Sequence, residues 1–156
     1  MKKFLFVIII AVSHFSCENL LNKEPLAALS VESGYRTSND ALKALAAAYN
    51  PLYNYPGYDG YSIYDIASDN AMKGGEGPSD GSYFNDIAHF TIATTNTVAT
   101  QVWQNSYLGI FRAHTVLEKV PTIEMNEEEK RRILAEAKFL RAYYYAILVK
   151  LFGDVP

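Results

Sequence analysis

The side chains with the greatest capacity for chemistry gather between positions 50 and 86, where turn-forming glycine and proline residues alternate with tyrosine, amide and carboxylate side chains. Such a mixture can bind sugars, because aromatic rings stack on the apolar face of a pyranose and polar groups pair with its hydroxyls. The residues of this kind are Tyr53, Tyr55, Tyr58, Tyr61, Tyr64, Asp69, Asn70, Lys73, Tyr83, Phe84 and Asn85. We expect segment 69–85 to form a loop at a ligand surface, with Tyr83 as the platform and Asp69, Asn70 and Asn85 as polar contacts. The alternative is that these tyrosines only cover a helix pair.

Four carboxylates of the same region could supply the pair of acids that hydrolyses a glycosidic bond. They are Asp65, Asp69, Asp80 and Asp86. Their glycine-rich setting favours turn and loop roles instead, and the sequence has no HExxH motif. We therefore predict a protein that is not an enzyme, with no catalytic residue, no metal and no cofactor.

Charge argues against nucleic acid as a partner. The 156 residues carry a net charge of −3, and the longest basic run is Lys130 to Arg132. Binding to a phosphate backbone requires a basic patch or stripe, which this sequence lacks.

The first residues have the layout of a secretory signal. Lys2 and Lys3 precede nine consecutive apolar residues, Phe4 to Val12, a run that is too short to span a bilayer. The run leads to Ser16 and then Cys17, the only cysteine, in an arrangement that resembles a bacterial lipobox. We predict that residues 1–16 are a lipoprotein signal peptide, that Cys17 is lipidated and that residues 17–36 form a tether. A free cysteine near an ordinary cleavage site is the alternative.

Helix signals dominate the rest of the chain. Thr37 and Asp40 match a capping box, which predicts a helix from about Ser38 that Pro51 kinks or ends. Residues 61–71 are periodic enough for a short helix. A long helix is predicted from Asn96 to Val120, with Pro121 as its stop. One face of this long helix carries Trp103, Tyr107, Ile110, His114 and Leu117, so packing is favoured over ligand binding for Trp103 and His114.

A last helix is predicted from an N-cap at Asn126 to about Phe152, as the second arm of an antiparallel hairpin. Its first turn suggests ion pairs from Glu127 to Arg131 and from Glu128 to Arg132. Two apolar stripes follow, and a helix that is apolar on more than one side must be covered by several partners. The stripes are Ile133, Ala137, Leu140, Tyr144, Ile147 and Leu151, and Phe139, Tyr143, Ala146 and Val149.

This last helix closely resembles the signature helix of the SusD/RagB family of Bacteroidota outer-membrane lipoproteins. The resemblance rests on EAKFLRAYYY at 136–145 and LFGDVP at 151–156, and on Trp103, Tyr107 and Ile110 in the preceding helix. It implies a mainly α fold of tetratricopeptide-like helix pairs with long irregular loops. Residues 37–156 would then be the amino-terminal helical domain of a longer protein.

The resemblance also implies a function. Members of this family are not enzymes; they capture oligosaccharides at the outer membrane, where they are lipid-anchored and face the cell exterior. They deliver the ligand to a TonB-dependent, SusC-like transporter, while RagB-like relatives serve peptide uptake. A truncated, anchored remnant that binds no ligand is the alternative for this chain.

Overall fold

The computed structural model describes residues 34–53, 61–68, 70–77 and 79–156. The predicted signal peptide, Cys17, most of the tether and Asp69 lie outside the described residues. Three long helices dominate: α3 (Ser38–Tyr53), α5 (Thr97–Lys119) and α6 (Glu127–Phe152). The shorter elements are the π-helix η1 (Tyr61–Asp65), helix α4 (Ser82–Ala88) and the 3-10 turn η2 (Val120–Thr122). The described part of the chain contains no strand, so the mainly α prediction is confirmed.

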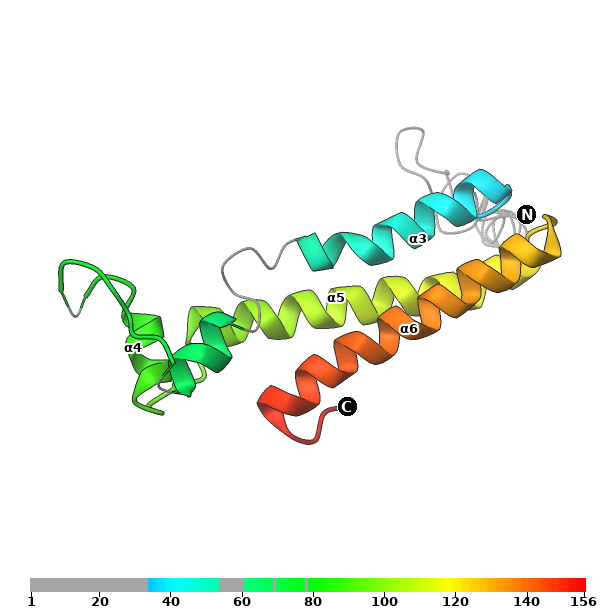
Figure 1. Ribbon diagram of the computed structural model, residues 1–156. Helices are drawn as coiled ribbons and strands as arrows, with labels where there is room; N and C mark the ends of the chain where they lie inside the picture. The colour runs from blue at the N-terminus through cyan, green and yellow to red at the C-terminus, as the bar shows by residue number, and fades with distance from the viewer. Residues whose placement is uncertain (1–33, 54–60, 69, 78) are drawn as a thin grey trace, which may run out of the picture. The chain divides into compact units, whose positions relative to one another are not determined.

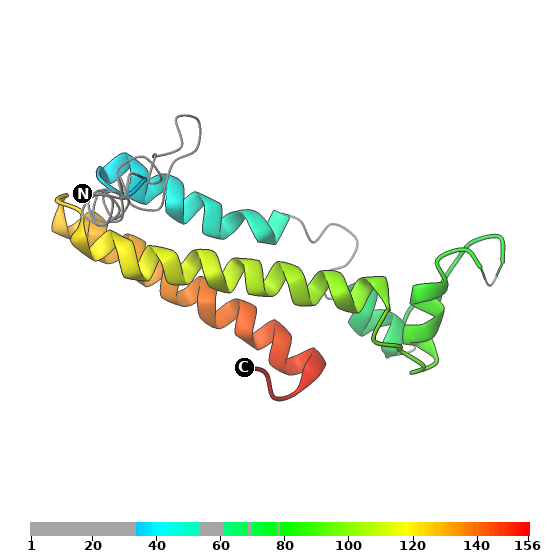
Figure 2. The ribbon, with the colours of Figure 1, turned by 180° about the vertical axis from the view of Figure 1, so that it is seen from behind.

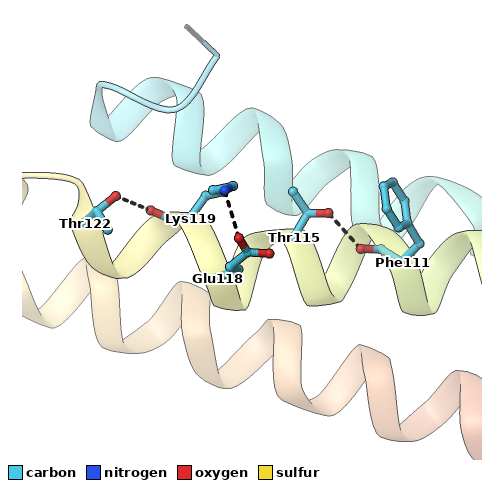
Figure 3. Close-up of polar contacts among 5 residues, drawn as sticks. All are labelled: Phe111, Thr115, Glu118, Lys119 and Thr122. Atoms are coloured by element: carbon cyan, nitrogen blue, oxygen red, sulfur yellow. Dashed lines mark hydrogen bonds and ion pairs between the residues drawn. The ribbon is translucent and has the colours of Figure 1, made fainter. Parts of the chain in front are cut away.

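Within residues 35–156, helix α5 packs against α3 on one side and against α6 on another (Figures 1 and 2). Helices α5 and α6 form the predicted antiparallel hairpin, joined by η2. Its turn is closed locally, because the Thr122 hydroxyl donates to the Lys119 carbonyl at 2.8 Å (Figure 3). Pro121, which has no N–H to donate, lies inside this turn, as the sequence predicted.

Helix α3 begins with the predicted capping box. The Asp40 N–H donates to the Thr37 hydroxyl at 3.3 Å, and the Thr37 N–H donates to the Asp40 carboxylate at 2.9 Å. The hydrogen bond from the Thr37 side chain, together with the backbone donors, lowers the pKa of the Asp40 carboxyl. The cap therefore contributes to stability above the unfolded-state pKa of this carboxyl, and the contribution is lost as pH falls through the lowered pKa.

Pro51 is buried in α3, and the helix continues past it to Tyr53. A proline cannot donate to the carbonyl four residues earlier, which here is that of Ala47. Arg112 of α5 supplies the missing donor: its guanidinium donates to the Ala47 oxygen at 3.0 Å and to the Asn50 side chain at 3.1 Å. The neighbouring helix thus satisfies the group that the proline leaves without a partner.

Helix α6 begins at the predicted N-cap, Asn126, which accepts from the Glu128 and Glu129 N–H groups at 3.0 and 3.1 Å. The predicted ion pairs are wrong. Lys130 pairs with Glu127 at 2.9 Å, and Arg132 pairs with Glu136 at 2.8 Å. For Arg132 a contact between helices explains the difference. The Tyr49 hydroxyl of α3 donates to the Glu136 carboxylate at 3.0 Å and so holds that carboxylate close to Arg132.

The buried face of α5 is rotated from the predicted stripe. Of the five stripe residues only Ile110 is buried, and Trp103 is 37% exposed, with its ring edge-on to Phe152 at a centroid distance of 5.1 Å. The buried residues are instead mostly small: Val98, Val102, Ser106, Gly109, Ile110, Ala113 and Val116. Small side chains face the partners because α5 packs closely on two helices at once, which pushes the large rings to the edges of the contact.

The two apolar stripes of α6 differ in burial. Ile133, Ala137, Leu140 and Tyr144 are buried as predicted, and Leu148 completes this face. The second stripe is exposed in the described part of the chain; Phe139 is 67% and Tyr143 46% accessible. The two rings stack on each other with centroids 6.4 Å apart.

Candidate functional site

A cavity of about 390 Å³ lies where η1, the loop 71–81 and α4 meet. It is lined by two aromatic rings, three charged side chains and several small or apolar residues. These are Asp65, Ile66, Ala71, Met72, Lys73, Gly74, Asp80, Gly81, Tyr83 and Phe84. Part of the segment predicted to form a ligand surface therefore lines an open hollow.

The rings of Tyr83 and Phe84 form an angled aromatic wall in this cavity. Their centroids are 4.7 Å apart and their planes are inclined by 57°. Two neighbouring rings at this angle offer apolar faces in two directions, which suits a ring-shaped ligand with one apolar face.

The charges of the cavity are mixed. Asp65 and Asp80 contribute carboxylates, while Lys73 contributes an ammonium that donates to the Gly77 carbonyl at 2.7 Å and to the Gly74 carbonyl at 3.3 Å. Hydrogen-bond acceptors and a donor of opposite charge thus surround the rings. This arrangement suits an uncharged ligand rich in hydroxyls better than an anion. Among the described residues no group of three or more His, Cys, Asp or Glu could hold a metal ion.

The loop on one side of the cavity is shaped by Gly75 and Asp80. Gly75 has a φ of +109°, and a Cβ at this position would overlap the Asp80 carboxylate. Only glycine combines this backbone conformation with this close approach. The Asp80 N–H also donates to the Gly77 carbonyl at 3.1 Å, which closes the turn that leads into α4.

The prediction that residues 69–85 form a loop is wrong at its end, because Tyr83 and Asn85 belong to helix α4. The signals at Gly74-Gly75 and Asp80-Gly81 do fall in turns and irregular backbone, but the seven helical residues of α4 are too few to show a period in the sequence. Asn96, the N-cap of α5, fixes α4 from outside: its side-chain amide donates to the Tyr83 carbonyl at 3.1 Å. The same side chain accepts from Val98 N at 3.0 Å, so one buried residue joins the two helices.

The structure places the predicted ligand contacts differently. Tyr83 lines the cavity, whereas Asn70 is exposed and Asn85 does not line it. The Asn85 carbonyl accepts from the His89 N–H at 3.1 Å, at the end of α4. Asp69 lies outside the described residues. Sequence reasoning did not single out Ile66 and Met72, whose apolar side chains carry no signal of their own.

The fold and the cavity together define a class of protein. It is a protein of paired long helices in which an irregular segment lines a hollow large enough for a small ligand. The comparisons agree with this class. A SusD-like family model described as "Starch-binding associating with outer membrane" matches residues 26–156. This chain belongs to the SusD-like family.

Individual relatives support the assignment. SusD-like protein P25 of Formosa agariphila is 28% identical over 99% of this chain, and SusD-like protein P38 of the same organism is 30% identical over all of it. A solved structure, titled "Laminarin binding SusD-like protein", is 35% identical and superposes with a TM-score of 0.70 over 78% of this chain. The chain spans 31% of the length of these two curated relatives and 27% of the solved chain.

The family is associated with the outer membrane by its description. In the ranges that the structure describes, no helix is both long and apolar enough to cross a bilayer.

Proposed function

We propose that this chain is the glycan-binding amino-terminal part of a non-catalytic outer-membrane lipoprotein. The observation that carries the proposal is the cavity beside α4, where the Tyr83 and Phe84 rings stand next to the Asp65 and Asp80 carboxylates and the Lys73 ammonium. The starch-binding description of the family and the laminarin-binding title of the solved relative support a glycan as the ligand. The bound glycan is then handed to a partner TonB-dependent, SusC-like transporter.

Sugar binding at this cavity follows from ordinary chemistry. The apolar faces of the rings lie against the C–H face of a pyranose, and the carboxylates and the ammonium pair with hydroxyls that would otherwise lose their water. The carboxylates act here as acceptors of hydrogen bonds and not as an acid and a nucleophile. The protein thus holds the sugar without breaking it.

Titration of the full chain with laminarin oligosaccharides tests this function. We expect Tyr83→Ala to weaken binding about tenfold, equivalent to about 1.4 kcal/mol, because half of the aromatic wall is lost. Tyr53→Ala is the matched control, since Tyr53 is 82% exposed and does not line the cavity. Equal affinities of the parent and Tyr83→Ala would remove this cavity as the site.

The same samples separate the other candidate functions. Release of reducing ends from the bound glycan would show an enzyme and contradict the proposal. Binding of oligopeptides in place of glycans would identify a RagB-like peptide-uptake subunit. A folded chain that binds neither class would be an anchored remnant without a ligand.

We also propose that Cys17 carries the lipid anchor, with the body of the protein facing the cell exterior. Two or three acyl chains at this residue would hold the chain on the outer membrane firmly, since a second chain multiplies the weak binding of a single one. In a bacterial host supplied with labelled palmitate, we expect the parent chain to incorporate label and Cys17→Ser to incorporate none. Label that persists in Cys17→Ser would contradict this assignment.

A further inference from the structure

A second hollow, separate from the cavity beside α4, lies between the long helices. It has a volume of about 500 Å³ and is lined by Ile110 and His114 of α5 and by Lys138, Arg141, Ala142 and Tyr145 of α6. We refer to it as the α5–α6 groove. Helix α3 contacts α6 through other positions: the Tyr144 hydroxyl donates to the Ala48 carbonyl, and Glu136 accepts from Tyr49. Thus α3 does not occupy the groove.

The α5–α6 groove is positively charged. Lys138 and Arg141 lie one turn apart on α6, and among the residues that the structure describes no carboxylate is within ion-pair distance of either. Two of the three basic residues at the start of this helix differ, because Lys130 pairs with Glu127 and Arg132 pairs with Glu136.

The two acidic residues closest in sequence to the groove, Glu136 of α6 and Glu118 of α5, already have partners. Glu136 pairs with Arg132 and accepts from the Tyr49 hydroxyl. Glu118 lies one turn after His114 on α5, and its carboxylate forms an ion pair with Lys119 at 2.8 Å (Figure 3). The hydrogen bond from Lys119 lowers the pKa of Glu118, so this carboxylate is charged, and it is already paired with Lys119. Arg141 is half-buried, and a partly desolvated guanidinium gains from an anion that enters the groove.

We propose that the α5–α6 groove binds the carboxylate of a uronic acid residue in an acidic glycan. The planar guanidinium of Arg141 can pair with both oxygens of a carboxylate, and the Lys138 ammonium adds a second charge. Tyr145 and Ile110 supply the apolar contact that a sugar ring needs beside its charged group. The proposal rests on the glycan-binding function proposed above and assigns a second subsite with a different preference.

The contrast between the two hollows supports this division. The cavity beside α4 contains two carboxylates and one ammonium, which repel an anion on balance, whereas the lining of the α5–α6 groove contains two fixed cations and no acid. An acidic glycan would therefore be sorted to the groove and a neutral one to the cavity.

The test is calorimetric titration of the full chain at low salt with trigalacturonate and with a neutral trisaccharide of glucose. We expect trigalacturonate binding that Lys138→Gln and Arg141→Gln each weaken about tenfold or more and that 0.5 M salt also weakens. Lys150→Gln is the control, because Lys150 is an exposed cation of α6 that does not line the groove. Lys138 is exposed, so its variant is expected to fold even if Arg141→Gln does not; circular dichroism checks both.

Three results would overturn the proposal: no preference for trigalacturonate over the neutral sugar, equal affinities in the parent and in folded Lys138→Gln, or a triglutamate peptide that binds as tightly. The two sites are also tested apart. Tyr83→Ala is expected to leave trigalacturonate binding unchanged, so failure of the cavity and failure of the groove give different results.

Discussion

Replacing Tyr144 with alanine is expected to lower the free energy of unfolding by about 3–5 kcal/mol, the cost of removing a large buried ring. Tyr144 is fully buried, its ring lies against Gly109 of α5, and its hydroxyl donates to the Ala48 carbonyl of α3 at 2.8 Å. One side chain of α6 therefore contacts both other long helices. Urea unfolding of the full chain, followed by circular dichroism, measures the loss.

Two variants separate the contributions of Tyr144. Tyr144→Phe keeps the ring and removes the hydroxyl, so we expect a loss of about 1 kcal/mol from the hydrogen bond to the Ala48 carbonyl. Tyr143→Ala is the control on the adjacent residue, which is 46% exposed, and a loss under about 1 kcal/mol is expected. An equal loss in Tyr143→Ala and Tyr144→Ala would contradict the packing described above.

The second large effect is expected at Gly109. A Cβ at this position would overlap the Tyr144 ring, so we expect Gly109→Ala to lower the free energy of unfolding by about 1–3 kcal/mol. The sign opposes intrinsic helix propensity, which favours alanine over glycine by about 0.5–1 kcal/mol. Gly74→Ala is the control, because no atom lies within 4 Å of a Cβ built there and we expect almost no change.

A double-mutant cycle tests whether the Gly109 effect arises from the Tyr144 ring. In the Tyr144→Ala background the overlap is gone, so Gly109→Ala is expected to be neutral or to stabilise by the propensity gain of about 0.5–1 kcal/mol. Strictly additive losses would show that Gly109 is needed for another reason. The same urea experiment on the four proteins decides between these outcomes.

The starts of the three long helices were predictable from the sequence because their causes are local. The reciprocal bonds of Thr37 and Asp40 and the caps at Asn96 and Asn126 join groups within three residues of each other, so the residue types alone indicate them. The family resemblance of α6 belongs to the same category, since it rests on a continuous run of residues.

The rotation of α5 was not predictable in this way. Several faces of a 23-residue helix can satisfy an apolar period, and the choice between them depends on two neighbours at once. Gly109 is the decisive residue, because it lets the Tyr144 ring approach the α5 backbone and so sets which residues face inward. Trp103 was accordingly predicted in the core and is found at its edge.

The sequence by itself determined where the three long helices begin, the family and the presence of Tyr83 among groups able to bind a sugar, because each depends on residues that are close along the chain. Only the tertiary structure brought Tyr83 to a cavity with Asp65, since that depends on the path of the loop and on the bond from Asn96 to the Tyr83 carbonyl. It likewise supplied Arg112 to the carbonyl that Pro51 leaves free. The physical reason is common to both: these contacts join residues far apart in the chain, and the packing of whole helices decides which of them meet.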